Sequence, residues 1–202
     1  FSYAVSRAAE SCALPAHSSE AALCAGDKVI MRSRFEKAGV PSPHFAEADA
    51  QTAALSSRAL GSFLKKHKLD FPLVVKPCDN MGARGCRLVH SVDEFGSALN
   101  DAVHYSKTSR AIVEEYMDGP EFSIDALVFN GELTVTGFAD RHIFFPPYFI
   151  ETGHTIPSKA ADAVKLQLFK IFAQGVYALG LTCGAAKADI KMTSKGPMVG
   201  EI

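Results

Sequence analysis

The clearest alternation of apolar and polar residues in the chain lies between residues 121 and 139. Apolar residues occupy every even position from Phe122 to Val128, Asn130-Gly131 has the composition of a two-residue turn, and the chain returns through Glu132–Ala139. Strict alternation is typical of a half-buried strand, and an Asn-Gly pair is typical of a hairpin turn. The pattern therefore predicts a β-hairpin with one face in a core.

Capping residues predict two helices. Asp27 is a suitable N-cap for a helix over Lys28–Ala38. Ser91, followed three residues later by Glu94, has the pattern of a capping box and predicts a helix that extends to about Tyr105. Apolar residues at helical spacing predict two further helices, over Thr52–His67 and Lys159–Leu179.

The remaining apolar runs predict strands and a second hairpin. The predicted strands are Leu73–Lys76, Arg87–His90 and Ala111–Tyr116, and the second hairpin covers Ala185–Ile202 with its turn through Ser194–Pro197. Asp140–Pro157 is predicted to be a long loop. Two hairpins and several helices in mixed order predict an α+β fold of two lobes packed around a cleft.

Length, charge and cysteine content narrow the class of protein. A chain of 202 residues is expected to form one domain or two small lobes. The formal net charge of −1 argues against a nucleic-acid partner recognised by bulk charge, and no uncharged run is long and apolar enough to predict a membrane span. The five cysteines are odd in number and form no CxxC pair, which argues for a reducing compartment and predicts a cytoplasmic protein.

Two carboxylates in the second hairpin are candidates for a metal site. If the turn centres on Lys195, Asp189 and Glu201 face each other across the two strands. Like charges at opposed positions destabilise a hairpin, and a divalent cation between them would remove that conflict. Mg²⁺ prefers one or two carboxylates together with phosphate oxygens. The alternative is an ordinary solvated strand face, and the spacing alone does not decide between the two.

A glycine-bearing loop follows the strand that ends at Lys76. Its sequence, CDNMGARGC, contains two glycines that allow a tight turn with exposed backbone N–H groups, and Arg84 adds positive charge. Such loops suit phosphate oxygens. No Walker A or GxGxxG pattern is present, and the alternative interpretation is an ordinary turn between two strands.

A third candidate segment joins the central strand to the first hairpin. Residues 114–117 end a strand just before Asp118-Gly119-Pro120, so their backbone could face an adenine edge, and Glu121 could then bind ribose hydroxyls. The alternative is a crossover with surface carboxylates. In the predicted long loop, His142 and His154 could contact a substrate or could be solvated. GxSxG and HExxH motifs are both absent.

In this order along the chain, the segments resemble the ATP-grasp superfamily, which includes biotin carboxylase, the carbamoyl phosphate synthetase large chain, D-alanine–D-alanine ligase and the L-amino-acid ligases. Gly26–Pro41 resembles the segment that opens their ATP-binding region, and Phe71–Pro77 resembles the strand that carries a phosphate-binding lysine. Pro146–Ser158 is most similar to a loop of the L-amino-acid and dipeptide ligase branch. The resemblance covers essentially the whole chain. It implies an ATP-grasp fold, in which two α+β lobes clamp a nucleotide cleft.

The resemblance implies a role for each candidate residue. Lys187 would lie near the transferring phosphate and Arg84 in a mobile lid, so both are implied to act in catalysis. Asp189 and Glu201 match the two magnesium carboxylates. The residues implied to bind ATP are Lys28, Lys76, Asn80, Gly82, Ala83, Arg84, Gly85, Glu114, Glu115, Tyr116, Met117 and Glu121. The candidate substrate contacts are Arg141, His142 and His154.

The resemblance also implies three parts and an incomplete chain. Residues 1–27 would be the remnant of an N-terminal domain, with a helix over Ser2–Ser11, and a linker. Residues 28–116 would form the lobe with the phosphate lysines and the lid, and residues 117–202 the lobe with the ribose and magnesium sites. Family members usually have an asparagine after the second carboxylate, whereas this chain stops at Ile202. We therefore expect the ATP-binding fragment of a longer ligase, truncated at both ends.

The implied reaction is ATP-driven ligation, with ATP and Mg²⁺ (or Mn²⁺) as cofactors. A carboxylate is activated as an acyl phosphate and captured by an amine or thiol. The implied partners are small acids and amines such as amino acids, without nucleic acid or membrane, and the full-length protein is expected to form a homodimer. Two alternatives stay open: a bicarbonate-using enzyme similar to biotin carboxylase or carbamoyl phosphate synthetase, and a non-catalytic nucleotide-binding module.

Overall fold

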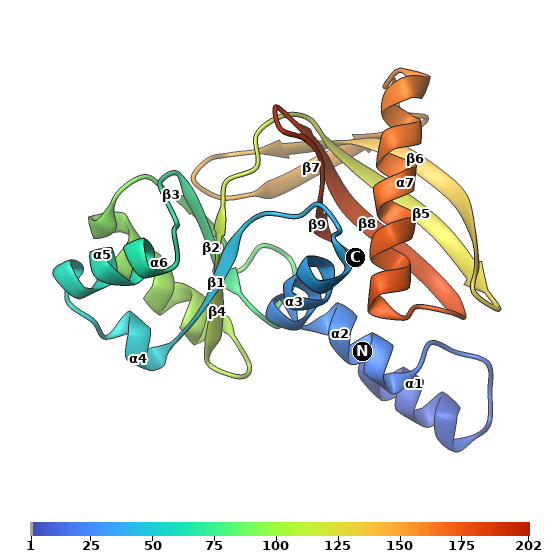
Figure 1. Ribbon diagram of the computed structural model, residues 1–202, viewed down its shortest axis with the longest axis horizontal. Coiled ribbons are helices and arrows are strands. Elements are labelled where there is room, and N and C mark those ends of the chain that lie inside the picture. The colour runs from blue at the N-terminus through green and yellow to red at the C-terminus, as the bar shows by residue number, and fades with distance from the viewer. Residues whose placement is uncertain (1) are drawn as a thin grey trace. The chain divides into compact units, whose positions relative to one another are not determined.

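The computed structural model describes residues 2–202, which form two compact units (Figure 1). Unit 1 contains residues 2–42, 117–142 and 153–202, and unit 2 contains residues 43–116 and 143–152. One boundary between the units lies after residue 116. Residues 28–42 belong to unit 1 together with the C-terminal half of the chain, and residues 143–152 belong to unit 2. Each unit is therefore formed by segments that are distant in sequence.

Unit 2 is built on a four-stranded antiparallel sheet with the strand order β1-β4-β2-β3. The strands are β1 (Phe45–Asp49), β2 (Leu73–Pro77), β3 (Arg87–Val89) and β4 (Arg110–Glu115). Three helices, α4 (Ala50–Ala53), α5 (Ser57–Lys66) and α6 (Val92–Tyr105), lie together on one side of this sheet (Figure 1). Val75 and Val113 point into the core that α6 covers with Phe95 and Leu99, so alternate positions such as Lys76 lie on the opposite face.

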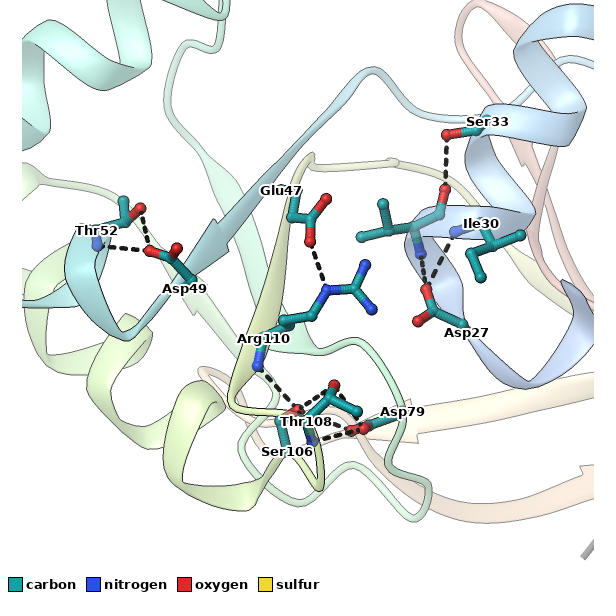
Figure 2. Close-up of polar contacts among 11 residues, drawn as sticks. Asp27, Ile30, Ser33, Glu47, Asp49, Thr52, Asp79, Ser106, Thr108 and Arg110 are labelled. Atoms are coloured by element: carbon teal, nitrogen blue, oxygen red, sulfur yellow. Dashed lines mark hydrogen bonds and ion pairs between the residues drawn. The ribbon is translucent and has the colours of Figure 1, made fainter. Parts of the chain in front are cut away.

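The helix predicted over Thr52–His67 is two helices. Asp49 caps α4 by accepting hydrogen bonds from the backbone N–H and the hydroxyl of Thr52 (Figure 2). Ser56 caps α5 by accepting one from Ala59 N–H. Each cap begins a separate helix, and Leu55, which lies between the two helices, is 42% exposed. The helix predicted from Ser91 is confirmed as α6, with the Ser91 hydroxyl accepting from Glu94 N–H.

Unit 1 is built on a five-stranded sheet with the strand order β7-β6-β5-β8-β9. The strands are β5 (Glu121–Phe129), β6 (Glu132–Phe144), β7 (Ile150–Thr155), β8 (Gly184–Thr193) and β9 (Gly196–Glu201). The helices are α1 (Ser2–Ser11), α2 (Ser19–Gly26), α3 (Lys28–Ala38) and α7 (Asp162–Leu179). α7 runs across the sheet (Figure 1), and its Leu168, Phe172 and Val176 are buried against Ile124 of β5 and Ala188 of β8.

The first hairpin agrees with its sequence pattern, and the loop after it does not. Asn130 and Gly131 have φ angles of 49° and 81°, the left-handed conformation that a two-residue hairpin turn requires. β6 continues to Phe144, and β7 pairs beside it, so most of the loop predicted over Asp140–Pro157 is strand. This edge region lacks a regular alternation, and its pairing depends on β6 rather than on local sequence. α7 begins at Asp162, three residues later than predicted.

None of the helices in residues 2–202 has the length and apolar character needed to cross a membrane.

Candidate functional site

The face of the five-stranded sheet opposite the core carries a group of charged residues, here called the charged face: Glu121, Arg141, Lys187, Asp189 and Lys191, together with Glu201. The register places Glu121 directly between Arg141 on β6 and Lys191 on β8. Phe122, Ile124 and Ile190 alternate with these residues and are buried in the core. Strict alternation along β5 and β8 therefore brings charged side chains from four strands onto one surface.

Asp189 and Glu201 are directly paired, as predicted from the sequence, but the register of the hairpin that pairs them differs from the predicted one. The turn is two residues long, Ser194-Lys195, and Thr193 pairs with Gly196 and Ile190 with Val199. Continued without interruption, this register would place Gly200 opposite Asp189. A β-bulge at this point makes Gly200 an extra residue and brings Glu201 opposite Asp189. The predicted turn centre at Lys195 is wrong for most of the hairpin, and the bulge restores the predicted pair.

Basic side chains surround the two carboxylates. Arg141 Nη1 lies 2.6 Å from Asp189 Oδ2, Lys187 Nζ lies 2.7 Å from Asp189 Oδ1, and Lys28 Nζ lies 3.1 Å from Glu201 Oε1. The charge conflict expected between the two carboxylates is therefore relieved by side chains of the protein itself.

Glu121 joins the same network. It contacts Arg141 at 2.5 Å and Lys191 at 3.5 Å, and Lys191 Nζ also donates to Met117 O. Four cations and three carboxylates meet in this network, which gives an excess of one positive charge. The cationic side chains of this network are suited to contact an anionic ligand such as a polyphosphate.

The donor set of the charged face fits a divalent cation that is shared with a ligand. Asp189 and Glu201 supply carboxylate oxygens from adjacent strands, and Mg²⁺ is commonly bound by one or two carboxylates plus phosphate oxygens. Residues 2–202 contain no group of three or more His, Cys, Asp or Glu side chains arranged around one metal position. A closed all-protein metal cage is therefore not the arrangement that this part of the chain offers.

Lys28 reaches Glu201 from the first turn of α3. Asp27 caps this helix by accepting hydrogen bonds from Val29 N–H at 2.9 Å and Ile30 N–H at 3.1 Å (Figure 2). Gly39 ends the helix in the left-handed conformation. The predicted helix and its cap are confirmed. They hold Lys28, which is 7% exposed, at a fixed place in unit 1.

In unit 2, Lys76 forms a buried ion pair that the sequence did not predict. Its Nζ lies 2.7 Å from Glu114 Oε2, and Glu114 is only 2% exposed. The register pairs Lys76 with Ile112 and Glu114 with Val74, so the two charged residues are diagonal neighbours on the face opposite the helices. The side chain predicted to help bind the base is thus the counter-ion of the predicted phosphate lysine.

The glycine-bearing loop is attached to unit 2 at its start. The Asp79 carboxylate accepts hydrogen bonds from the Ser106 hydroxyl and from the N–H and hydroxyl of Thr108 (Figure 2), and a further one from Lys107 N–H. Burial alone would raise the pKa of Asp79, but these hydrogen bonds outweigh it and hold the pKa below its usual value. Asp79 is not among the residues predicted from sequence, because its partners lie 27–29 residues away and leave no local signal.

The predicted ligands within this loop have different positions. Asn80 donates to Tyr105 O at 2.9 Å and accepts from Met81 N–H, so its side chain holds the loop itself. Gly82, Ala83 and Gly85 all have positive φ angles, and Arg84 is exposed. The tight turn predicted from the glycines is therefore present.

The backbone predicted to face the base is partly engaged within unit 2. Glu115 N–H donates to His44 O, and Tyr116 N–H donates to Pro72 O. An adenine contact by either residue would have to use another group.

Of the three candidate substrate residues, which all belong to unit 1, only one lies in the charged face. Arg141 lies within the charged face, whereas His142 contacts the Thr155 hydroxyl at 2.8 Å and His154 is exposed on β7.

Comparison with known proteins places this arrangement in a family. The ATP-grasp domain family matches residues 69–202, about two-thirds of the chain, including Lys76, Asp189 and Glu201. This chain belongs to the ATP-grasp family. The chain is 29% identical over 181 residues to a D-alanine–D-alanine ligase of Ectopseudomonas mendocina (strain ymp), covering 87% of this chain and 54% of that protein. It is 33% identical over 134 residues to D-alanine–D-alanine ligase B of Pseudomonas syringae pv. tomato, covering 64% and 40%.

Solved structures support the ATP-grasp fold. An L-amino acid ligase from Bacillus licheniformis superposes with a TM-score of 0.79 at 26% identity, covering 97% of this chain and 44% of that one. The VanG D-Ala:D-Ser ligase from Enterococcus faecalis gives 0.83 at 18% identity, covering 99% and 59%, and shows the fold alone. The predicted α+β ATP-grasp fold is confirmed. The chain spans about half the length of the relatives that it matches.

Proposed function

We propose that the full-length protein is an ATP- and Mg²⁺-dependent ligase that activates a small carboxylate as an acyl phosphate for attack by an amine. The observation that carries this proposal is the charged face, where Asp189 and Glu201 are paired and lie within ion-pair distance of Arg141, Lys187 and Lys28. Similarity to D-alanine–D-alanine ligases and to an L-amino acid ligase supports the reaction class.

The proposed chemistry asks the protein mainly for positioning and charge compensation. A carboxylate oxygen attacks the γ-phosphorus of ATP and ADP leaves; the amine then attacks the acyl carbon, releases phosphate and loses a proton. Phosphoryl transfer is accelerated chiefly by alignment and by neutralising the phosphate oxygens. Lys187, half exposed on β8, and Lys28 at the start of α3 are proposed to bind those oxygens. A Mg²⁺ ion held by Asp189 and Glu201 would supply further charge neutralisation.

The remaining assignments are also proposals. Glu121 is proposed to accept hydrogen bonds from the ribose hydroxyls, because its carboxylate is already oriented by Arg141 and Lys191. Lys76, Arg84 and the backbone of the glycine-bearing loop are proposed phosphate contacts of unit 2. We also propose amino acids or similar small molecules as substrates, a homodimeric full-length protein and a cytoplasmic location.

The proposal is tested with the full-length protein, ATP, Mg²⁺ and pooled amino acids, measured as ADP release. We expect release that depends on the amino acids, and Asp189→Asn should reduce it on the order of 100-fold, as the loss of one preorganised charge contact commonly does. Asp125→Asn is the matched control, because Asp125 is exposed on the same face of β5, opposite Lys187. Absence of amino-acid-dependent ADP release, or equal activity of the two variants, would contradict the proposal.

A further inference from the structure

Arg32 is a fully buried cation next to the charged face, and neither the sequence pattern nor the proposed reaction assigns it a role. It lies one helical turn after Lys28 on α3, so the two side chains leave the same side of the helix. Its exposed fraction is 0%, and its Nη2 donates to the backbone oxygen of Gly200 at 2.5 Å. Burying a guanidinium is unfavourable unless the group is hydrogen-bonded. The hydrogen bond from Arg32 to Gly200 therefore has a structural reason to persist in the folded protein.

The residue that Arg32 contacts is the extra residue of the bulge. Gly200 lies between the pairs Ile190–Val199 and Asp189–Glu201. A Cβ atom at position 200 would lie 2.9 Å from the backbone oxygen of Asp189, so the strands approach here more closely than a side chain allows. Two features of the chain accompany the bulge: a glycine at position 200 and a donor that binds its carbonyl group.

The bulge decides which face of the sheet Glu201 occupies. Without it, Glu201 would pair with Ala188, whose side chain points into the core and is 0% exposed. A shift of one residue moves a side chain to the opposite face of a sheet. With the bulge, Glu201 lies on the charged face beside Asp189, and the next residue, Ile202, packs against the core beside Gly175.

We propose that Arg32 is a positioning residue for metal-nucleotide binding: by holding the Gly200 carbonyl it fixes the bulge that places Glu201 beside Asp189. This inference rests on the proposed function, because it takes Asp189 and Glu201 as the metal carboxylates. Lys28 and Arg32 then act on the same segment in different ways. Lys28 contacts the Glu201 carboxylate itself, and Arg32 contacts the backbone that orients it.

The test is a Mg²⁺ titration of ATP binding, measured by calorimetry and by the shift in melting temperature, on the full-length protein. Arg32→Gln should weaken the Mg²⁺ dependence about 10- to 100-fold, the range typical when a partner of a metal ligand is removed, and by no less than threefold. ATP affinity measured with a chelator should change less than threefold. Arg32→Lys should weaken the Mg²⁺ dependence by at least threefold but by less than Arg32→Gln does, because an ammonium can donate one hydrogen bond from a shorter side chain.

Arg34→Gln is the matched control: the same substitution two residues along α3, where Arg34 pairs with Glu20 instead of the hairpin. The inference is overturned if Arg32→Gln changes the Mg²⁺ dependence less than threefold, or if it weakens binding equally with and without metal, as a purely structural residue would. If Arg32→Gln does not fold, Arg32→Lys decides by the same threefold criterion. Wild-type protein that binds no Mg·ATP would overturn the proposed function and this inference together, whereas Mg·ATP binding that is unaffected in the variant overturns the inference alone.

Discussion

Replacement of Lys76 by methionine should destabilise unit 2, whether or not Lys76 also binds nucleotide. Lys76 Nζ lies 2.7 Å from the carboxylate of Glu114, and the two side chains are 14% and 2% exposed. Removing one partner of a buried pair typically destabilises a protein by about 3–5 kcal/mol. In a chain of this size each kcal/mol lowers the melting temperature by about 2–4 °C, so Lys76→Met should lower it by about 6–20 °C. Thermal unfolding followed by circular dichroism measures this effect.

The double variant Lys76→Met/Glu114→Gln separates the two roles of Lys76. Removing both charges should recover most of the lost stability, because the double variant contains no buried carboxylate without a counter-ion. If Lys76 also binds phosphate, the double variant should still bind ATP more weakly than the wild type. Lys66→Met, at an exposed position on α5, controls for the loss of a lysine charge. A melting temperature for Lys76→Met within 2 °C of the wild type would refute the reasoning, because the pair would then contribute little to the fold.

Two further predictions concern the glycine-bearing loop. Gly85→Ala should destabilise the protein by about 1–3 kcal/mol, because a Cβ atom there would lie 3.0 Å from Tyr105 at a φ of +72°. Gly82→Ala has a similar φ but open space around it, so it should lower the free energy of unfolding less in denaturant titrations. Equal effects of the two substitutions would contradict the steric explanation. Asp79→Asn should lower stability at neutral pH and flatten its loss in acid. The pKa of Asp79 is depressed in the folded state, so its contribution is complete above the unfolded value near 3.8 and disappears as the pH falls through the folded pKa. Unfolding measured between pH 2 and 7 should show this difference, and parallel curves for wild type and variant would contradict it.

The elements that were predicted well are those whose stability is local. The cap of α3 at Asp27 and the cap of α6 at Ser91 use side chains within three residues of the N–H groups they bind. The Asn130-Gly131 turn likewise needs only its own two residues to adopt a left-handed conformation. β7 and the end of β6 were missed because an edge strand is stabilised by its neighbour in the sheet, and that neighbour is not visible in a local pattern.

The candidate site divides in the same way. The sequence by itself determined the kinds of side chain, the two hairpins that carry them and the alternation that separates a charged face from a core. Only the tertiary structure decided that Arg141 contacts both Glu121 and Asp189, and that Glu114 is the buried partner of Lys76. The position of Glu201 shows the physical reason most clearly: it depends on a bulge whose carbonyl is held by Arg32, 168 residues away. Contacts at that separation form only when the chain packs, so they leave no trace in the spacing of neighbouring residues.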